Sequence, residues 1–339
     1  MKKKLAIVIS LVLVFATLFM TACGDNTDAG KTPANDAVAS GDLSSISINV
    51  GTGGSTGTYY GFCNVISSLL KEKTGANLMI QSSGASKANI LDIDDGIVDM
   101  AIVQNDVMDY AFNGTSLFAD VGAIDSFSTL GAAYAEVCQI VARADSGITT
   151  VADLKGKRVS VGDSGSGVEF NAQQILGAYD ITFADIDKQN LSFQASADAL
   201  KDGKIDAFFC VAGIPTTAIT DLAMNKDITV VAVDDDKFAA LSEQYGFYTQ
   251  QIVPKDTYKG MTEDVKTVAV MATYIVDKDL PEDAVYNITK SIFENKDAIA
   301  KAHVKGRELD VNKAVDGIPA EVPLHPGAEK YFKEVGAIK

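Results

Sequence analysis

Two glycine-rich turns constrain the fold of this chain more than any other feature. The first spans residues 50–60 (VGTGGSTGTYY) and the second residues 161–167 (VGDSGSG), and each lies between a short apolar segment and an amphipathic one. Such a turn leaves the first N–H groups of the following helix without partners inside the helix, and the helix dipole directs its positive end towards them. We therefore expect each turn to be able to hold an anionic group, on two α/β lobes that face one another across a cleft.

Short apolar segments alternate with amphipathic segments along most of the chain. The apolar segments that we predict as strands are residues 46–50, 78–81, 100–104, 138–142, 158–161, 207–211, 229–233 and 268–275. Helical spacing of apolar residues between the early ones, as at Phe62, Ile66 and Leu69, is typical of α/β lobes with mostly parallel sheets. Ligands of such sheets bind beyond the carboxyl ends of strands, where both turns lie.

The N-terminus has the pattern of an export signal. Three lysines after Met1 precede an apolar run from Leu5 to Met20, which is shorter than the roughly 20 residues of a membrane span. The following Thr-Ala-Cys resembles a bacterial lipobox, which implies that residues 1–22 are a signal peptide and that Cys23 is lipidated; an ordinary signal peptide with an incidental cysteine is the alternative. We expect an extracytoplasmic protein anchored by lipid to the bacterial cell membrane, with residues 23–42 as a flexible tether.

The remaining chain is long enough for two lobes and a hinge between them. We expect residues 43–143 to form the first part of lobe one, residues 144–248 to form lobe two, and residues 249–339 to return to lobe one and add C-terminal helices. The two crossings are expected at residues 142–147 and 248–254, where apolar segments run into polar turns.

Charge and cysteine content exclude several classes of partner. The net charge is −16, and loss of the three lysines of the export signal makes it −19, so nucleic acid is not expected as a partner. An anionic ligand would need donors inside a cleft. Cys63, Cys138 and Cys210 lie in apolar segments without CxxC spacing, which predicts buried free thiols, and the chain shows neither a cofactor motif nor a metal-site pattern.

Hydroxyl and N–H groups near predicted strand ends are the candidate ligand contacts. They are Gly54, Ser55, Thr56, Thr58 and Tyr59 in the first turn, Ser164, Gly165, Ser166 and Gly167 in the second, and Ser83, Gly84, Gln104 and Asp106 in lobe one. Helix capping and ordinary turn chemistry explain the same residue types. Arg143 is read as part of a structural ion pair, with a carboxylate clamp as the alternative.

An enzyme is the competing interpretation of the first turn. Residues 53–57 fit G-x-S-x-G, the nucleophile elbow of α/β-hydrolases, with Ser55 as the nucleophile. The base would have to be His303 or His325, the only histidines, and no oxyanion-type His-Gly-Gly run precedes the motif. We therefore expect no catalysis and keep a secreted serine hydrolase as an alternative.

Together, these elements resemble the TAXI-type solute receptors of tripartite TRAP transporters. The resemblance rests on the two turns and on four further segments, residues 104–106 (QND), 152–159 (ADLKGKRV), 202–209 (DGKIDAFF) and 323–328 (PLHPGA). It implies an α/β, two-lobe periplasmic-binding-protein fold of type II-like topology with two hinge crossings. The implied function is capture of a small organic acid or amino acid by a monomer, with glutamate or glutamine favoured, and its delivery to a membrane permease driven by an ion gradient.

The resemblance also carries expectations for single residues. Related amino-acid receptors hold the ligand's ammonium with an aspartate a few residues beyond their Asp-Ala strand, but here Asp206-Ala207 is followed by no nearby acid. If an amino group is bound, Asp106 or Glu136 would take that role. Phe209 is either an apolar wall of the site or part of the core, and His325 is part of a rigid C-terminal turn. A sensory lipoprotein on the same fold is a further alternative.

Overall fold

The computed structural model describes residues 41–339. The predicted signal peptide, the lipidation site at Cys23 and nearly all of the predicted tether lie outside the described residues. None of the helices in the described part is both long enough and apolar enough to cross a membrane.

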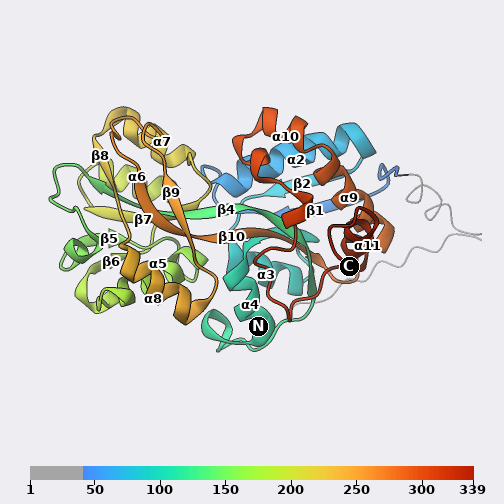
Figure 1. Cartoon of the computed structure of the whole chain (residues 1–339), viewed down its shortest axis with the longest axis horizontal. Coiled ribbons are helices and arrows are strands. Elements are labelled where there is room, and N and C mark those ends of the chain that lie inside the picture. Colours follow the sequence, from blue (N-terminus) through green and yellow to red (C-terminus); the bar gives the residue numbers. More distant parts are fainter. Residues whose placement is uncertain (1–40) are drawn as a thin grey trace, which may run out of the picture. The chain divides into compact units, whose positions relative to one another are not determined.

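Lobe one is built on three parallel strands and the helices that follow them (Figure 1). The elements are β1 (Ser47–Gly51), α2 (Thr58–Thr74), β2 (Asn77–Gln81), α3 (Ser86–Asp94), β3 (Met100–Gln104) and α4 (Asn105–Asn113). The first glycine-rich turn connects β1 to α2, as the sequence predicts.

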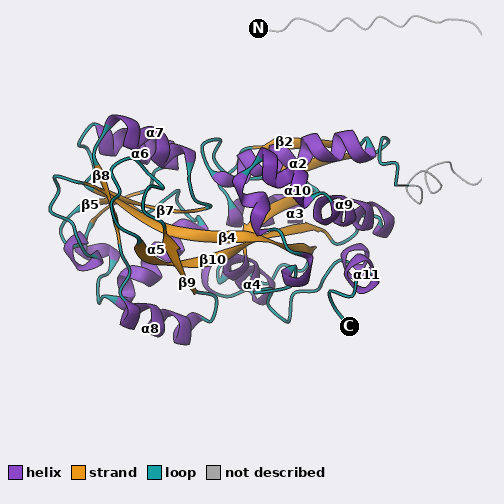
Figure 2. Ribbon diagram, turned by 45° about the horizontal axis from the view of Figure 1, so that its top comes forward, coloured by secondary structure: helices purple, strands orange, loops and turns teal. Residues whose placement is uncertain are grey.

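Lobe two repeats this arrangement with β5, β6 and β7 in parallel. Its elements are β5 (Arg158–Ser160), α5 (Gly167–Ala178), β6 (Asp187–Gln189), α6 (Phe193–Lys201), β7 (Ala207–Ala212), α7 (Thr217–Asn225), β8 (Ile228–Val231), α8 (Asp235–Tyr245) and β9 (Thr249–Val253). Figure 2 shows α6 and α7 on one face of the sheet and α5 and α8 on the other. The second glycine-rich turn connects β5 to α5.

Two long antiparallel strands, β4 (Phe127–Arg143) and β10 (Val265–Asp277), run through both lobes (Figures 1 and 2). They join all ten strands of the described residues into one hydrogen-bonded sheet, whose main path is β2-β1-β3-β10-β4-β7-β5-β6. The chain therefore passes between the lobes on paired strands, which is the arrangement of a two-strand hinge.

The C-terminal segment packs on lobe one. It contains α9 (Glu282–Glu294), α10 (Lys296–Ala302), the 3-10 turn η4 (Val304–Glu308) and α11 (Pro326–Glu334). Ile288, Ile292 and Phe332 of these helices share a core with Phe62 of α2. His325 caps α11, because its Nδ1 accepts the Gly327 N–H at 3.2 Å, so this residue has the structural role expected for it.

Each of the two hinge strands packs into the core of lobe one with one end and into a core of lobe two with the other. Tyr134 of β4 lies in a core of lobe one, and Ile140 lies in a core of lobe two. On β10, Val268 belongs to lobe two and Tyr274 to lobe one. The passage thus lies within these strands, whereas we expected the two crossings at residues 142–147 and 248–254.

Candidate functional site

A cavity of about 360 Å³ lies between the two lobes and is lined by both. Lobe one contributes Gly53, Gly54, Ser55, Thr56, Gly57, Thr58, Tyr59, Ser82, Ser83, Ala85, Ser86 and Gln104, and lobe two contributes Asp163, Ser166, Gly167, Val168, Ser192, Phe193, Gln194, Val211 and Ala212. Glu136 lines the cavity from the hinge strand β4. The site therefore lies beyond the carboxyl ends of the strands, where an α/β sheet is expected to bind ligands.

The first glycine-rich turn presents main-chain donors that the protein itself does not use. Gly57 is the N-cap of α2 and provides no side-chain cap, and the first turn of this helix contains no acidic residue. Within the described residues, no hydrogen bond engages the N–H groups of Gly54, Ser55 or Thr56. These N–H groups lie just before the N-cap of α2, where the positive end of the helix dipole favours an anion.

The second turn is arranged differently, because its own acidic residue Glu169 binds one of its N–H groups. The Ser166 side chain caps α5 by accepting the Glu169 N–H, and the Glu169 carboxylate accepts the Gly165 N–H at 2.6 Å. Lys188 lies 2.6 Å from the same carboxylate. Although burial raises the pKa of Glu169, these partners outweigh it and hold that pKa below its usual value. Glu169 thus places a negative charge in the first turn of α5, the part of this helix that faces the cavity.

A buried polar group forms the hinge side of the cavity. Glu136 is 2% exposed, Gln104 is 2% exposed and Tyr59 is 6% exposed. Burial raises the pKa of Glu136 to about 8, against the opposing effects of the Tyr59 hydroxyl, the Lys305 ammonium and the Gln104 amide. The Tyr59 hydroxyl affects this pKa but does not reach hydrogen-bond geometry with any described residue, and Gln104 Oε1 is also unpaired.

Direct contacts hold the lobes together around the cavity. Asn171 of α5 donates to the Asp106 carboxylate of α4 at 2.8 Å, and the same amide group donates to the Tyr248 hydroxyl at 3.0 Å. Gln174 donates to the Tyr110 hydroxyl of α4 at 3.1 Å. All five side chains are buried, so the lobes are in a closed arrangement that is stabilised by polar groups outside the cavity.

Gly167 lies at a point of close approach between the lobes. A Cβ at this position would lie 1.9 Å from Oε1 and 2.8 Å from Cδ of Gln104, and 3.0 Å from Val107. A side chain at this helix start would therefore displace Gln104 or keep the lobes apart.

Ten of the predicted site residues line the cavity: Gly54, Ser55, Thr56, Thr58, Tyr59, Ser83, Gln104, Glu136, Ser166 and Gly167. The structure brings them together from both lobes and from the hinge. Whether they contact a ligand stays a prediction.

Five predicted site residues lie outside the cavity lining: Gly84, Asp106, Ser164, Gly165 and Phe209. Asp106 points its carboxylate to Asn171 and so connects the lobes. Phe209 is fully buried in a core of lobe two, which is the second of the roles expected for it. Gly84 and Ser164 are exposed at their turns, and the N–H of Gly165 is bonded to Glu169.

Other residues of the cavity were not predicted from the sequence. Ser192, Phe193 and Gln194 begin α6 after the strand β6, whose three residues are all polar and gave no strand signal. The serine that caps this helix, accepting the Ala195 N–H, was the available signal. Asp163 belongs to the predicted second turn, but the adjacent serines and glycines were chosen instead.

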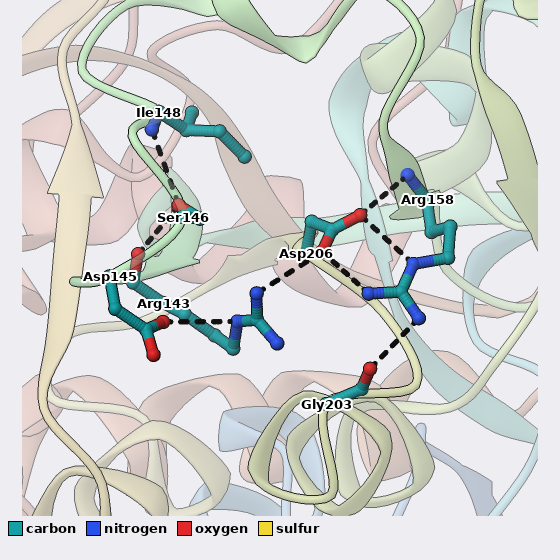
Figure 3. Close-up of polar contacts among 7 residues, drawn as sticks. All are labelled: Arg143, Asp145, Ser146, Ile148, Arg158, Gly203 and Asp206. Atoms are coloured by element: carbon teal, nitrogen blue, oxygen red, sulfur yellow. Dashed lines mark hydrogen bonds and ion pairs between the residues drawn. The ribbon is translucent and has the colours of Figure 1, made fainter.

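Arg143 has a structural ion pair, as expected from the sequence. Figure 3 shows the guanidinium groups of Arg143 and Arg158 on either side of Asp206, with Asp145 near Arg143. The Arg143 and Arg158 distances to the carboxylate are 3.4 and 2.7 Å. None of these residues lines the cavity, so the arginine is not positioned to clamp a ligand there.

The geometry does not favour Ser55 as a nucleophile. Both histidines lie within the described residues, and neither lines the cavity that contains Ser55. His303 accepts the Lys305 N–H through Nδ1, and His325 caps α11. Ser55 therefore has no imidazole base beside it. Cys63, Cys138 and Cys210 are buried free thiols, as the sequence predicts.

Comparisons with known proteins identify the family and the fold. The sequence profile of the NMT1-like family matches residues 50–336. The alkanesulfonate-binding protein SsuA from Xanthomonas axonopodis pv. citri, bound to MOPS, is 15% identical, with 85% of this chain and 83% of that chain covered and a TM-score of 0.50. A protein from Bordetella bronchiseptica RB50 is 16% identical, with 88% and 91% covered and a TM-score of 0.52.

These similarities confirm the predicted fold class, an α/β fold with the two lobes of periplasmic-binding proteins. At such low identity they establish shared architecture.

Proposed function

We propose that this chain, which belongs to the NMT1-like family, is an extracytoplasmic solute-binding receptor that captures a small ligand between its lobes and delivers it to a membrane transporter. The observation that carries the proposal is the cavity between the lobes, because it combines unused main-chain donors with buried polar side chains. Clefts between domains that present a few convergent polar groups are the usual sites of ligand recognition.

The finer assignment follows the sequence motifs. Their ordered resemblance to TAXI-type receptors supports a TRAP transporter, whose membrane permease would be the partner, and a lipid anchor at Cys23 would keep the receptor at the membrane. The ligand class is a small organic acid or amino acid, with glutamate or glutamine favoured. The donors of the first turn support an acidic ligand, since they remain unpaired in the described residues.

Closure of the hinge would give the receptor its affinity. The hydrogen bond from Thr58 Oγ1 to the Gly213 carbonyl, at 3.0 Å, joins lobe one to lobe two, as does the bond between Asn171 and Asp106. These bonds exist only when the lobes are together. A ligand that contacts both lobes adds stabilisation to the same state and so shifts the population towards it.

Thermal unfolding of the purified protein against amino acids, dicarboxylates and other small organic anions tests the proposal. A ligand at 100 times its dissociation constant should stabilise the folded state by about 2.7 kcal/mol, which raises the melting temperature measurably. Small-angle scattering with and without the stabilising ligand should show compaction. A protein that neither gains stability nor changes its radius with any of these compounds would contradict the proposed function.

A further inference from the structure

We propose that Glu136 determines the class of ligand by accepting an ammonium group, so that the ligand is a zwitterion whose carboxylate meets the start of α2. The inference rests on the proposed function and names the substrate class of the same site. It also decides between the two acids that the sequence left open, because Asp106 is used between the lobes and Glu136 lines the cavity.

The charged side chains that line the cavity are acidic, which favours a ligand with a positive group. Among the described residues, the charged side chains that line it are Glu136 and Asp163, and no lysine or arginine does so. The carboxylate of Asp163 is exposed and stays hydrated, whereas Glu136 is 2% exposed and loses the hydration that would stabilise its charge. A buried carboxylate without a paired cation is costly, so the closed site gains most from a ligand that brings a positive group to Glu136.

Lys305, the cation among the described residues that lowers the pKa of Glu136, is paired with a second carboxylate. The Lys305 side chain is 3% exposed, and its ammonium lies 2.6 Å from Glu308 Oε1. The other oxygen of Glu308 accepts the N–H of Ala135, the neighbour of Glu136 on the hinge strand, at 2.9 Å. The same ammonium lowers the pKa of Glu136 through its charge, so one cation serves two carboxyl groups, and the group is neutral while Glu136 is protonated and negative once Glu136 ionises. This remaining charge is what a ligand ammonium would neutralise.

Unpaired oxygen atoms beside Glu136 match the donors of an ammonium group. Gln104 Oε1 and the Tyr59 hydroxyl are buried, line the cavity, and have no hydrogen-bond partner among the described residues. An ammonium has three N–H donors, and a carboxylate, an amide oxygen and a hydroxyl oxygen are three acceptors for them. A ligand with no donor group at this place would leave these acceptors unsatisfied, which costs binding free energy, and a ligand with a single hydroxyl there would satisfy only one of them.

Proton exchange follows from the burial of Glu136. The free carboxyl has a pKa of about 8 and is mostly protonated near pH 7, while a bound ammonium favours the ionised form. The groups that face it are Tyr59 of α2, Asp106 of α4 and Lys305 of η4, besides Gln104; Tyr134 and Cys210 also feel its charge. Binding should therefore release a proton, and affinity should rise with pH from about 6 to 8.

Calorimetry with pairs of ligands that differ only in the amine tests the proposal. The pairs are glutamate with 2-hydroxyglutarate, aspartate with malate, and alanine with lactate. We expect the protein to prefer the amino acid of its best pair by about 100-fold, and Glu136→Gln to reduce that preference to a few-fold. Glu243→Gln, which changes an exposed acid of α8 outside the cavity lining, should leave the preference intact. Titrations in two buffers of different ionisation enthalpy should show proton release for the unmodified protein and none for Glu136→Gln.

The outcomes separate this inference from the proposed function. Equal affinity for the hydroxy acid and the amino acid, or an unchanged preference in Glu136→Gln, overturns the role of Glu136 while the receptor function stands. Absence of binding and of lobe closure with every pair overturns both. Circular dichroism and the melting temperature of Glu136→Gln establish that the variant is folded, and this near-isosteric substitution replaces the buried ionisable carboxyl by an amide of nearly the same volume.

Discussion

The two glycine-rich turns have the same position in their lobes but differ in how their donors are used. At the start of α2, Gly57 provides no cap, and the N–H groups of Ser55 and Thr56 are unpaired in the described residues. At the start of α5, Ser166 caps the helix and Glu169 binds the turn. The sequence predicts two anion sites, but the geometry favours one, because the second turn already holds the carboxylate of its own chain.

The difference suggests that the two turns have different tasks, one in binding the charge of the ligand and the other in packing against lobe one. The first turn can exchange water for a ligand anion, while the second is held rigid by Glu169 and Lys188 and approaches lobe one at Gly167. We infer that lobe one supplies the charge recognition and that lobe two closes over the ligand by shape. Each of the following experiments tests one side of that comparison.

The largest effect is expected from Gly167→Ala, which tests the role of fit in the second turn. Its Cβ would lie 1.9 Å from Gln104 Oε1, so either the lobes stay apart or Gln104 is displaced in the cavity. We expect ligand affinity to fall by about 10- to 100-fold, the equivalent of the 1–3 kcal/mol that overpacking typically costs. Calorimetry measures the affinity, and small-angle scattering reports whether the ligand still compacts the protein.

Gly177→Ala is the matched control, since Gly177 belongs to the same helix and an added Cβ would meet no atom within 4 Å. It should bind ligand normally and be slightly more stable, as expected for alanine in a helix. Normal affinity in Gly167→Ala would show that binding does not need the close approach of the lobes seen here.

A smaller effect is expected from Ser55→Asp, which gives the first turn the kind of charge that the second already has. A carboxylate beside the free N–H groups would compete with the ligand anion and repel it, and we expect about a tenfold loss of affinity at low salt. Ser164→Asp places the same charge on the exposed part of the second turn, outside the cavity lining, and should change affinity by no more than about twofold. Equal losses in the two variants would abolish the distinction between the turns.

Strong local patterns explain how much of the fold could be predicted. The apolar segments at 100–104 and 207–211 coincide with β3 and with all but the last residue of β7, because buried parallel strands are continuous apolar runs. The hinge strand β4 begins 11 residues before the predicted segment, at Phe127. Its first part, FSTLGAAYAEV, is rich in glycine, alanine, serine and threonine, and these residues gave no strand signal.

The site was predictable where it followed the strand ends and unpredictable where it depended on contacts between the lobes. The positions of Ser55, Thr56 and Ser166 follow from the turn between a strand and a helix. The role of Asp106 does not, because its partner Asn171 lies on the other lobe and far along the chain. The same holds for Glu169, whose partner Lys188 comes from the polar strand β6.

The smallest effect is expected from Glu169→Gln, which tests whether the acid of the second turn is structural. The variant loses the charge that binds the Gly165 N–H and Lys188, and we expect about 1 kcal/mol less stability near pH 7, with ligand affinity changed by less than about twofold. Because the folded state lowers the pKa of Glu169, its stabilisation is present above the unfolded pKa and is lost as pH falls through the folded one.

Urea unfolding near pH 7 and near pH 3 should therefore show a larger stability difference between Glu169→Gln and the unmodified protein at the higher pH than at the lower. Glu243→Gln, at an exposed position of α8, is the control and should change stability by less than about 0.5 kcal/mol at both. A gain in ligand affinity in Glu169→Gln would mean that the second turn also receives the ligand anion, since removal of its resident carboxylate would then relieve repulsion. Both turns would in that case bind the ligand anion, and they would differ only in how strongly they do so.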